Sequence, residues 1–247
     1  MTNRWQCQVC GYIHRGASPP THCPSCGAPF TSFVRAERDP AARLREVNVV
    51  TPRPAGYRYV IIGNSAAGRA AARALRVLHP AGQVTVISEE AVPVYARPLL
   101  PDLIAGMDAD AFFASGANLN MAGIDLRLGA IAAQIDTAAG QVVLATGETI
   151  PYDALLLATG SAPTVVPWPG ADADGIAYFR NYADARRIAG LMHDAQEVAV
   201  IGGGLLGLEF VRAFQTAGKR ITQIIREPRV GGPAMDEPGS ALLRKAL

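Results

Sequence analysis

Residues 57–68 read YRYVIIGNSAAG, an apolar run that ends directly in a glycine-rich turn. The alanine-rich stretch after the turn reaches about Leu78 and has the composition of a helix. The local order is therefore strand, tight turn and helix, which predicts the start of an α/β unit with a buried parallel strand.

The turn has the spacing of a dinucleotide-binding fingerprint. In such a turn the first glycine makes the bend, the second lets the backbone approach a pyrophosphate, and the third packs the helix on the strand. Gly63 and Gly68 hold the first and third places, and Ser65 stands in the middle place, where it is small enough to keep the approach open. The other turn residues expected to contact the nucleotide are Ala66 and Ala67.

A second strand is predicted over 84–88, and an acidic pair follows it. An acid about 20 residues after the last glycine grips the ribose hydroxyls in this type of fold. Glu89 is the predicted ribose contact, and Glu90 beside it is the alternative.

The same pattern returns near the end of the chain. Residues 197–201 form an apolar run, and a full GxGxxG turn and a helix ending near Gly218 follow. This predicts a second nucleotide site. Its expected contacts are Gly202, Gly204, Leu205, Leu206 and Gly207.

The strand after this turn, predicted over 220–225, indicates the type of coenzyme. An acid at its end would suit NADH, whereas an arginine could pair with the 2′-phosphate of NADPH. Ile225 and Arg226 stand there, with Glu227 following, so both coenzymes stay open.

All four cysteines fall in the first 26 residues, as two CxxC knuckles: Cys7 with Cys10, and Cys23 with Cys26. Two such knuckles put four thiolates on one metal ion, and a module of about 36 residues needs that metal for its stability. The spacing alone suits a structural zinc site as well as iron.

Composition narrows the class of protein. The chain has 247 residues, 49% of them hydrophobic, which supports folded domains, and a formal net charge of +2, which does not favour nucleic acid or a membrane surface as partner. No apolar run approaches a membrane span, and the polar start lacks the plan of a secretory signal. We expect a cytoplasmic location, where the thiols stay reduced.

The stretch 94–100, VYARPLL, resembles the segment after the second strand in flavin reductases that serve ferredoxins, rubredoxins and nitrite reductases. That resemblance implies that Arg97 and Pro98 line a flavin site, and Asp102 stands where some members carry a lysine. The segment 152–163 resembles the ATG signature of two-dinucleotide flavoproteins, which implies that Thr159 and Gly160 pass close to FAD. Strands of a small sheet are expected between these segments, over 126–134 and 141–144.

The second turn takes the nicotinamide cofactor in that family. Glu209 matches a glutamate near the nicotinamide and flavin rings, and is the predicted catalytic residue. A glutamate in the first helical turn would also complement the helix dipole, which is the alternative for Glu209. Since no cysteine follows Cys26, we expect no dithiol relay.

The N-terminal segment resembles the short rubredoxin domain also found on rubrerythrins. The match rests on Trp5, Tyr12, Phe33, the four cysteines and the glycine after each knuckle. It implies that Cys7, Cys10, Cys23 and Cys26 hold one iron, with zinc as the alternative. Trp5, Tyr12, Phe30 and Phe33 would form an apolar wrap around it.

The expected fold class is α/β, with a rubredoxin-like metal knuckle domain followed by an FAD-binding and a partial NAD(P)-binding Rossmann-like fold. The expected segments are a metal domain over 1–36, a linker over 37–56 with a short helix over 40–46, an FAD-binding segment over 57–168, and an incomplete NAD(P)-binding domain over 169–247. We expect the chain to stop within the last domain, because relatives continue for about 150 residues more.

The hypothesis is a flavin-dependent NAD(P)H oxidoreductase that passes electrons from NADH or NADPH through FAD to the iron, with a downstream redox protein as a further partner. The alternative is a truncated, catalytically incompetent fragment that binds metal and FAD, or an electron carrier.

Overall fold

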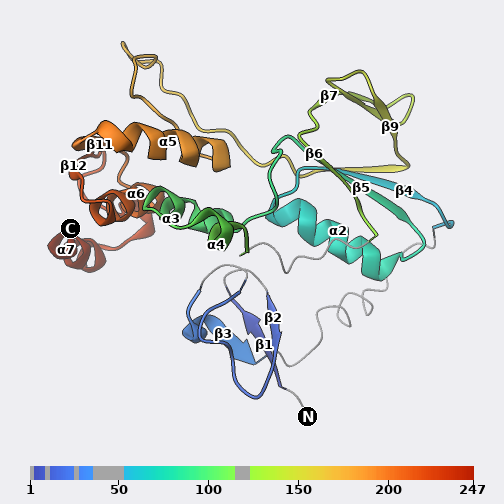
Figure 1. The fold of residues 1–247 in the computed structure, drawn as a ribbon, viewed down its shortest axis with the longest axis horizontal. Coiled ribbons are helices and arrows are strands. Elements are labelled where there is room, and N and C mark those ends of the chain that lie inside the picture. Colours follow the sequence, from blue (N-terminus) through green and yellow to red (C-terminus); the bar gives the residue numbers. More distant parts are fainter. Residues whose placement is uncertain (1–2, 9–11, 25–27, 36–52, 115–122) are drawn as a thin grey trace. The chain divides into compact units, whose positions relative to one another are not determined.

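The computed structural model describes residues 3–8, 12–24, 28–35, 53–114 and 123–247. They divide into two compact units, Met1–Ala96 with Phe113–Ser161, and Arg97–Phe112 with Ala162–Leu247. Both units combine helices with parallel strands, which confirms the expected α/β class (Figure 1). Among the helices described here, none has the length and apolar character needed to cross a bilayer.

The N-terminal module is a small antiparallel sheet in the order β2-β1-β3. Its elements are β1 (Arg4–Cys7), β2 (Ile13–Arg15), the 3-10 turn η1 (Phe30–Ser32) and β3 (Phe33–Arg35). Trp5 and Tyr12 pack against a buried cluster that contains Phe33. Phe30 is 57% exposed, so the wrap is smaller than expected and excludes it.

The first unit is built on a parallel four-stranded sheet in the order β10-β4-β5-β6. The strands are β4 (Arg58–Ile62), β5 (Gln83–Ser88), β6 (Asp125–Leu128) and β10 (Ala154–Leu157), and the helix α2 (Ala66–Leu78) packs on them. The predicted strand over 57–62 and the helix to Leu78 are confirmed. The strands of this sheet are apolar on both faces, because one face packs on Ala72 of α2 and the other packs on a second sheet.

That second sheet is the antiparallel β7-β8-β9, with β7 (Ala132–Asp136), β8 (Gln141–Leu144) and β9 (Thr149–Pro151). The single strand expected over 126–134 is wrong, because β6 and β7 belong to different sheets. Gly129 lies between them with φ +68°, a conformation that glycine adopts without strain and that turns the chain from one sheet to the other. The strand expected over 141–144 is confirmed as β8.

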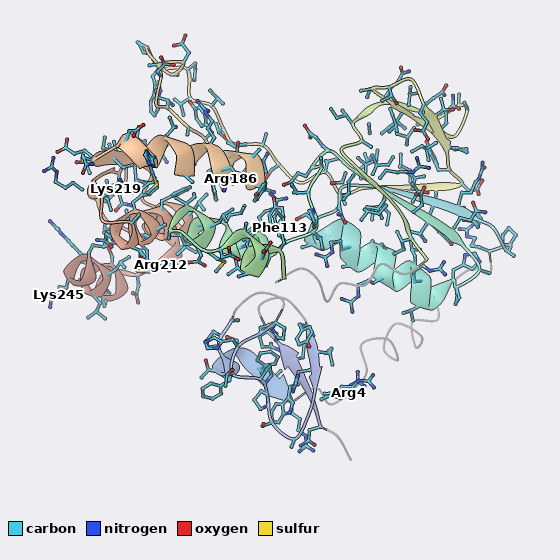
Figure 2. The ribbon with its side chains drawn as sticks, in the orientation of Figure 1. Arg4, Phe113, Arg186, Arg212, Lys219 and Lys245 are labelled. Atoms are coloured by element: carbon cyan, nitrogen blue, oxygen red, sulfur yellow. The ribbon has the colours of Figure 1, made fainter. Side chains whose placement is uncertain are left out.

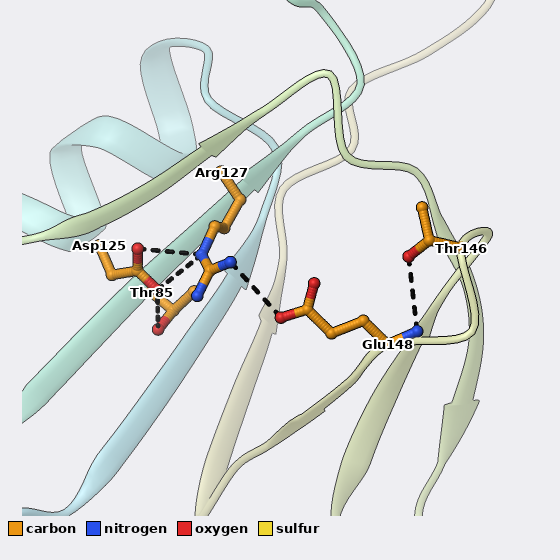
Figure 3. A network of polar contacts seen from close by, with 5 residues as sticks. All are labelled: Thr85, Asp125, Arg127, Thr146 and Glu148. Carbon is orange, nitrogen blue, oxygen red and sulfur yellow. Dashed lines mark hydrogen bonds and ion pairs between the residues drawn. The ribbon is translucent and has the colours of Figure 1, made fainter.

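A polar network joins β6 to the turn between β8 and β9 (Figure 3). The Arg127 Nε donates to both carboxylate oxygens of Asp125 at 3.0 and 2.9 Å, and its Nη1 reaches Glu148 Oε1 at 3.4 Å. Thr85 Oγ1 donates to Asp125 at 3.5 Å, and Thr146 Oγ1 accepts from the Glu148 amide at 3.4 Å. The exposed pairs align the two sheets more than they stabilise them.

The second unit repeats the order strand, turn, helix, strand. It contains the 3-10 turn η2 (Arg97–Leu99), α3 (Leu100–Ile104), most of α4 (Ala109–Ala114), α5 (Tyr182–Asp194), β11 (Glu197–Ile201), α6 (Leu205–Thr216), β12 (Arg220–Ile224), the 3-10 turn η3 (Gly232–Ala234) and α7 (Glu237–Ala246). β11 and β12 pair in parallel, as the sequence predicted for 197–201 and for the strand after it.

Residues 97–112 precede β6 in the chain but pack in the second unit. α3 lies against α5 and α6, and the Phe112 ring, fully buried, stacks on Tyr182 with centroids 5.9 Å apart. Arg212 on α6, labelled in Figure 2, donates to Asp102 on α3 at 2.5 Å. The domain limits expected at 57–168 and 169–247 stay predictions, and the helix expected over 40–46 lies outside the described residues.

Candidate functional site

The first glycine turn connects β4 to α2 and is held by close backbone contacts. Gly63 has φ +114°, and a Cβ there would lie 2.1 Å from the Ala158 carbonyl oxygen. A Cβ at Gly68 would lie 1.8 Å from the Gly63 carbonyl oxygen. Both places therefore require glycine for the fold itself, before any ligand is considered.

The middle place of the turn has different requirements. Ser65 is the N-cap of α2 with φ −97° and ψ −162°, an extended conformation open to any residue. Its counterpart Gly204 caps α6 with φ −78° and ψ −178°, and a Cβ there would meet nothing within 4 Å. A serine in this place is thus compatible with the protein, and only a closely bound ligand would be sensitive to it.

The first turn of α2 offers a site for an anion. Ala66 and Ala67 are exposed, and the amides at the start of a helix lack partners within it and carry partial positive charge. Buried polar atoms without a hydrogen-bond partner lie on either side: Asn64 Oδ1 before the helix, and Arg69 Nε and Nη2 one turn into it. Open amides, a glycine cradle and unpaired buried donors fit the pyrophosphate of a dinucleotide such as FAD.

The two acidic residues after β5 differ in exposure and in hydrogen bonding. Glu89 follows the strand directly and is exposed. Glu90 is half-buried, its carboxylate accepts a hydrogen bond from the Tyr95 hydroxyl, and its carbonyl accepts one from Ser88 Oγ at 3.2 Å. The carboxylate at 90 is thus already engaged, which favours Glu89 as the ribose contact, and this assignment stays a prediction.

Thr159 and Gly160 come directly after β10 and Ala158. The Ala158 amide donates to the Ile62 carbonyl at 2.8 Å, so this segment passes beside the first turn at Gly63. Gly160 has φ +75°, and both Thr159 and Gly160 are exposed. The structure therefore places Thr159 and Gly160, which were expected to pass close to FAD, next to the first glycine turn.

An ion pair sets the register of the strands that deliver both segments. Arg58 at the start of β4 donates to Asp153 just before β10, with Nη2 to Oδ1 at 2.6 Å, Nε to Oδ2 at 3.1 Å and the backbone amide to Oδ2 at 2.8 Å. These hydrogen bonds lower the pKa of Asp153 from 3.8 to about 2. The pair lies at the opposite end of the strands from the turn and has a positioning role.

Arg97 and Pro98 fall in the second compact unit. Arg97 Nη1 donates to the Arg180 carbonyl at 2.5 Å, and Pro98 is exposed. Asp102, one turn further, pairs with Arg212. Asp102, which stands where some flavin reductases carry a lysine, is therefore paired with an arginine from α6.

The second glycine turn repeats the close contact of the first. Gly202 has φ +137°, and a Cβ at Gly207 would lie 2.3 Å from the Gly202 carbonyl oxygen, which also accepts from Gln223 Nε2 at 2.9 Å. Leu205 and Leu206 are 58% and 47% exposed, so the first turn of α6 is open like that of α2. The five expected contacts thus form one continuous turn.

Glu209 is the fifth residue of α6 and is exposed. The helix begins at Leu205, and its first turn holds no acidic residue. The alternative in which Glu209 complements the dipole from the first turn is therefore wrong, because the effect falls off beyond that turn. The catalytic role of Glu209 stays a prediction.

Ile225 fills the place where an acid would bind the ribose of NADH. A Cβ at Gly203 would lie 2.7 Å from Ile225 Cγ2, so the isoleucine packs against the glycine turn. The Arg226 side chain is 92% exposed, and its Nη2 donates to Glu227 Oε1 at 2.9 Å. This hydrogen bond lowers the pKa of Glu227, whose carboxylate accompanies the arginine at the end of β12.

The two cysteines of the N-terminal module that the structure describes are buried together. Cys7, at the end of β1, is fully buried and Cys23 is 3% exposed, and both belong to the cluster that contains Phe33. The Cys7 amide donates to the Tyr12 carbonyl at 2.9 Å, and the Cys23 amide donates to the Ala28 carbonyl at 2.7 Å, so the first cysteine of each knuckle is hydrogen-bonded to a residue beyond that knuckle.

Cys10 and Cys26 lie outside the described residues. Within the residues that are described, no three metal-ligating side chains come together. The two buried thiols and the paired CxxC spacing fit a four-thiolate metal site.

Sequence reasoning missed the two buried groups beside the first turn, Asn64 and Arg69. Neither belongs to the glycine spacing of the fingerprint. The one signal available was a basic residue directly after the third glycine, in a helix that otherwise begins with alanines.

Comparison with known proteins agrees with this arrangement. The family model described as pyridine nucleotide-disulphide oxidoreductase matches residues 57–247, and that of the rubrerythrin, rubredoxin-like domain matches residues 5–34. An NADH oxidase of Enterococcus faecalis is 31% identical over 196 residues, which are 76% of this chain and 44% of that protein. A rubredoxin-NAD(+) reductase of Pseudomonas putida is 28% identical over 197 residues, 76% of this chain and 50% of the relative.

Among solved structures, the NADH:rubredoxin oxidoreductase of Clostridium acetobutylicum matches with a TM-score of 0.66 at 27% identity, over 78% of this chain and 50% of that one. The chain therefore spans half or less of the length of these relatives.

Proposed function

Because this chain belongs to the pyridine nucleotide-disulphide oxidoreductase family and carries a rubredoxin-like domain, we propose that it passes electrons from NAD(P)H through FAD to iron. The iron centre would be held by Cys7, Cys10, Cys23 and Cys26. The activity of the whole protein, its acceptor and its partners are part of this proposal.

The observation that carries the proposal is the repeated glycine turn. In each turn the Cβ that the third glycine lacks would lie within 2.3 Å of the first glycine's carbonyl oxygen, at 1.8 Å for Gly68 and 2.3 Å for Gly207. Each turn follows a parallel strand and opens a helix whose first two residues are exposed. Two dinucleotide sites in one chain suit a reaction between two nucleotide cofactors.

When bound, FAD accepts a hydride from reduced nicotinamide and releases electrons one at a time, chemistry that side chains cannot supply. The contribution of the chain is to bind and orient. Gly63–Gly68 would hold the pyrophosphate at the start of α2, Glu89 the ribose hydroxyls, and Thr159 and Gly160 the flavin side.

The second turn would hold the nicotinamide coenzyme through the open first turn of α6. Glu209, exposed on the same helix, is the proposed residue beside the reacting rings. We favour NADPH as coenzyme, because Ile225 occupies the place of the acid and Arg226 extends into solvent beside it. A downstream redox protein would receive the electrons from the iron.

The test is anaerobic reduction of the purified chain loaded with iron and FAD, followed by absorbance. Addition of NADPH should bleach the flavin bands first and the thiolate–iron bands afterwards. The matched control is C23S, which should lose the iron bands and keep the flavin bleaching, because the buried thiol lies outside both nucleotide turns.

Three results would overturn the proposal. A preparation that holds only zinc under iron-rich conditions would remove the one-electron acceptor. Flavin that bleaches while the iron bands persist would leave two unconnected modules. A chain that binds iron but never FAD would favour the alternative, an electron carrier or a fragment without turnover.

A further inference from the structure

Arg69 differs from three other arginines of this chain in its burial and in its hydrogen bonding. Arg58, Arg127 and Arg212 each donate to a carboxylate. Arg69 is 7% exposed, and its Nε and Nη2 have no hydrogen-bond partner. A buried guanidinium with unpaired donors is unfavourable unless an anion completes it.

Burial lowers the pKa of Arg69 to about 10, with the nearby positive charge of Arg73 as a further cause. The side chain nevertheless keeps its positive charge near neutral pH. The site therefore holds a permanent buried cation, and its missing partner should be a group with negative charge.

The position of Arg69 on α2 directs that cation toward the glycine turn. The Arg69 amide donates to the Ser65 carbonyl at 3.0 Å, so the residue lies one turn above the N-cap. Helical side chains point back toward the N-terminus, and an extended arginine is about as long as one turn of about 5.4 Å. A side chain that points back in this way would bring the guanidinium toward the open amides of Ala66 and Ala67.

We propose that the Arg69 guanidinium directly contacts the pyrophosphate of the dinucleotide bound at the Gly63–Gly68 turn. This inference rests on the proposed function, in which that dinucleotide is FAD. The planar guanidinium presents parallel N–H donors that match phosphate oxygens, so it would add charge and orientation to the helix amides. Such hydrogen bonds to charged groups contribute about tenfold to a hundredfold in affinity.

The experiment compares wild type with R69Q and with R73Q as the matched control. Arg73 is one turn further along the same helix and is exposed, so its substitution removes the same charge without removing the buried donors. Dissociation constants are measured for FAD and for ADP, which carries the pyrophosphate without the flavin. Phosphorus NMR of bound ADP reports on the phosphates themselves.

In R69Q, the dissociation constants of FAD and ADP should rise about tenfold to a hundredfold, and the phosphorus resonances of bound ADP should shift. In R73Q both should stay within about twofold. R69K keeps the charge and loses the fork of donors, so it should fall between wild type and R69Q, and it serves as the deciding variant should R69Q fail to fold.

Binding of FAD and ADP by R69Q within about twofold of wild type would overturn the inference, as would equal losses in R69Q and R73Q. This failure is distinguishable from that of the proposed function. Were the inference alone wrong, NADPH would still bleach flavin and iron in turn. Were the function alone wrong, ADP binding would still depend on Arg69 while electrons never reached the iron.

Discussion

Replacement of Gly68 by alanine isolates the contact on which the first nucleotide site is built. Gly68 lies inside α2 without a positive φ, so alanine is conformationally allowed there. The added Cβ would nevertheless lie 1.8 Å from the Gly63 carbonyl oxygen and 3.2 Å from Ile61 Cγ2. The first atom is backbone and cannot rotate away.

Two opposing terms decide the sign of the effect. Alanine in place of glycine inside a helix stabilises by about 0.5–1 kcal/mol. Overpacking against a well-packed neighbour costs about 1–3 kcal/mol, and a contact with fixed backbone belongs at the upper end. We therefore expect G68A to destabilise the first unit by about 2 kcal/mol and to separate α2 from the turn.

Gly190 provides the matched control. It lies inside α5, and a Cβ there would meet nothing within 4 Å. G190A should therefore keep only the favourable term and stabilise its helix by about 0.5–1 kcal/mol. The two variants differ in the clash and not in the chemistry of the substitution.

Hydrogen exchange measured by mass spectrometry reads each helix separately, and FAD titration reads the site. G68A should speed exchange in α2 and weaken FAD binding by at least about tenfold, the equivalent of about 1.4 kcal/mol. G190A should slow exchange in α5 and leave FAD binding unchanged. Normal exchange and normal FAD affinity in G68A would refute the reasoning, because the turn would then tolerate a wider separation from the helix.

Three further substitutions test the ion pair at Asp153, the packing of Phe112 in the second unit and the choice of coenzyme. Because Arg58 holds the pKa of Asp153 near 2 against an ordinary 3.8, the carboxylate stabilises the fold above about pH 4 and this is lost as pH falls toward 2. D153N should melt lower at pH 7, and its melting temperature should meet that of wild type near pH 2. F112A should cost the second unit about 3–5 kcal/mol in urea unfolding, since the buried ring stacks on Tyr182. R226A should raise the dissociation constant of NADPH about tenfold and leave that of NADH within about twofold, and equal effects would contradict a 2′-phosphate contact.

The sequence was sufficient for the elements whose signals are local. An apolar run followed directly by glycine indicates both a buried strand and the bend after it. For this reason the strands over 57–62 and 197–201 were predicted correctly. The run over 126–134 misled because its continuous strand-like pattern hides Gly129, whose positive φ moves the chain to another sheet. A single glycine in such a run does not reveal in advance whether it bends the strand.

What depends on packing at long range could not be predicted. Residues 97–112 precede β6 in the chain, yet α3 packs on α5 and α6, a contact that the order of the elements does not indicate. Arg69 was missed for a related reason, since only burial distinguishes it from the exposed Arg73 one turn away. Both are arginines on the same alanine-rich helix, and the position of Arg69 directly after the third glycine does not by itself show that its side chain is buried.

The two glycine turns also separate what the fold requires from what a ligand requires. Gly68 and Gly207 are fixed by the carbonyl oxygen of the first glycine, so a larger residue at either would disturb the protein with or without nucleotide. In the second turn a Cβ at the middle place, Gly204, would meet nothing within 4 Å, and Ser65 stands at the equivalent place of the first turn in an extended conformation. A serine hydroxyl there can donate to a phosphate oxygen where a glycine offers only its amide. Together with Arg69, this would make the first turn richer in side-chain donors than the second, and a dinucleotide that stays bound through many reaction cycles needs such donors more than a coenzyme that must leave after each one.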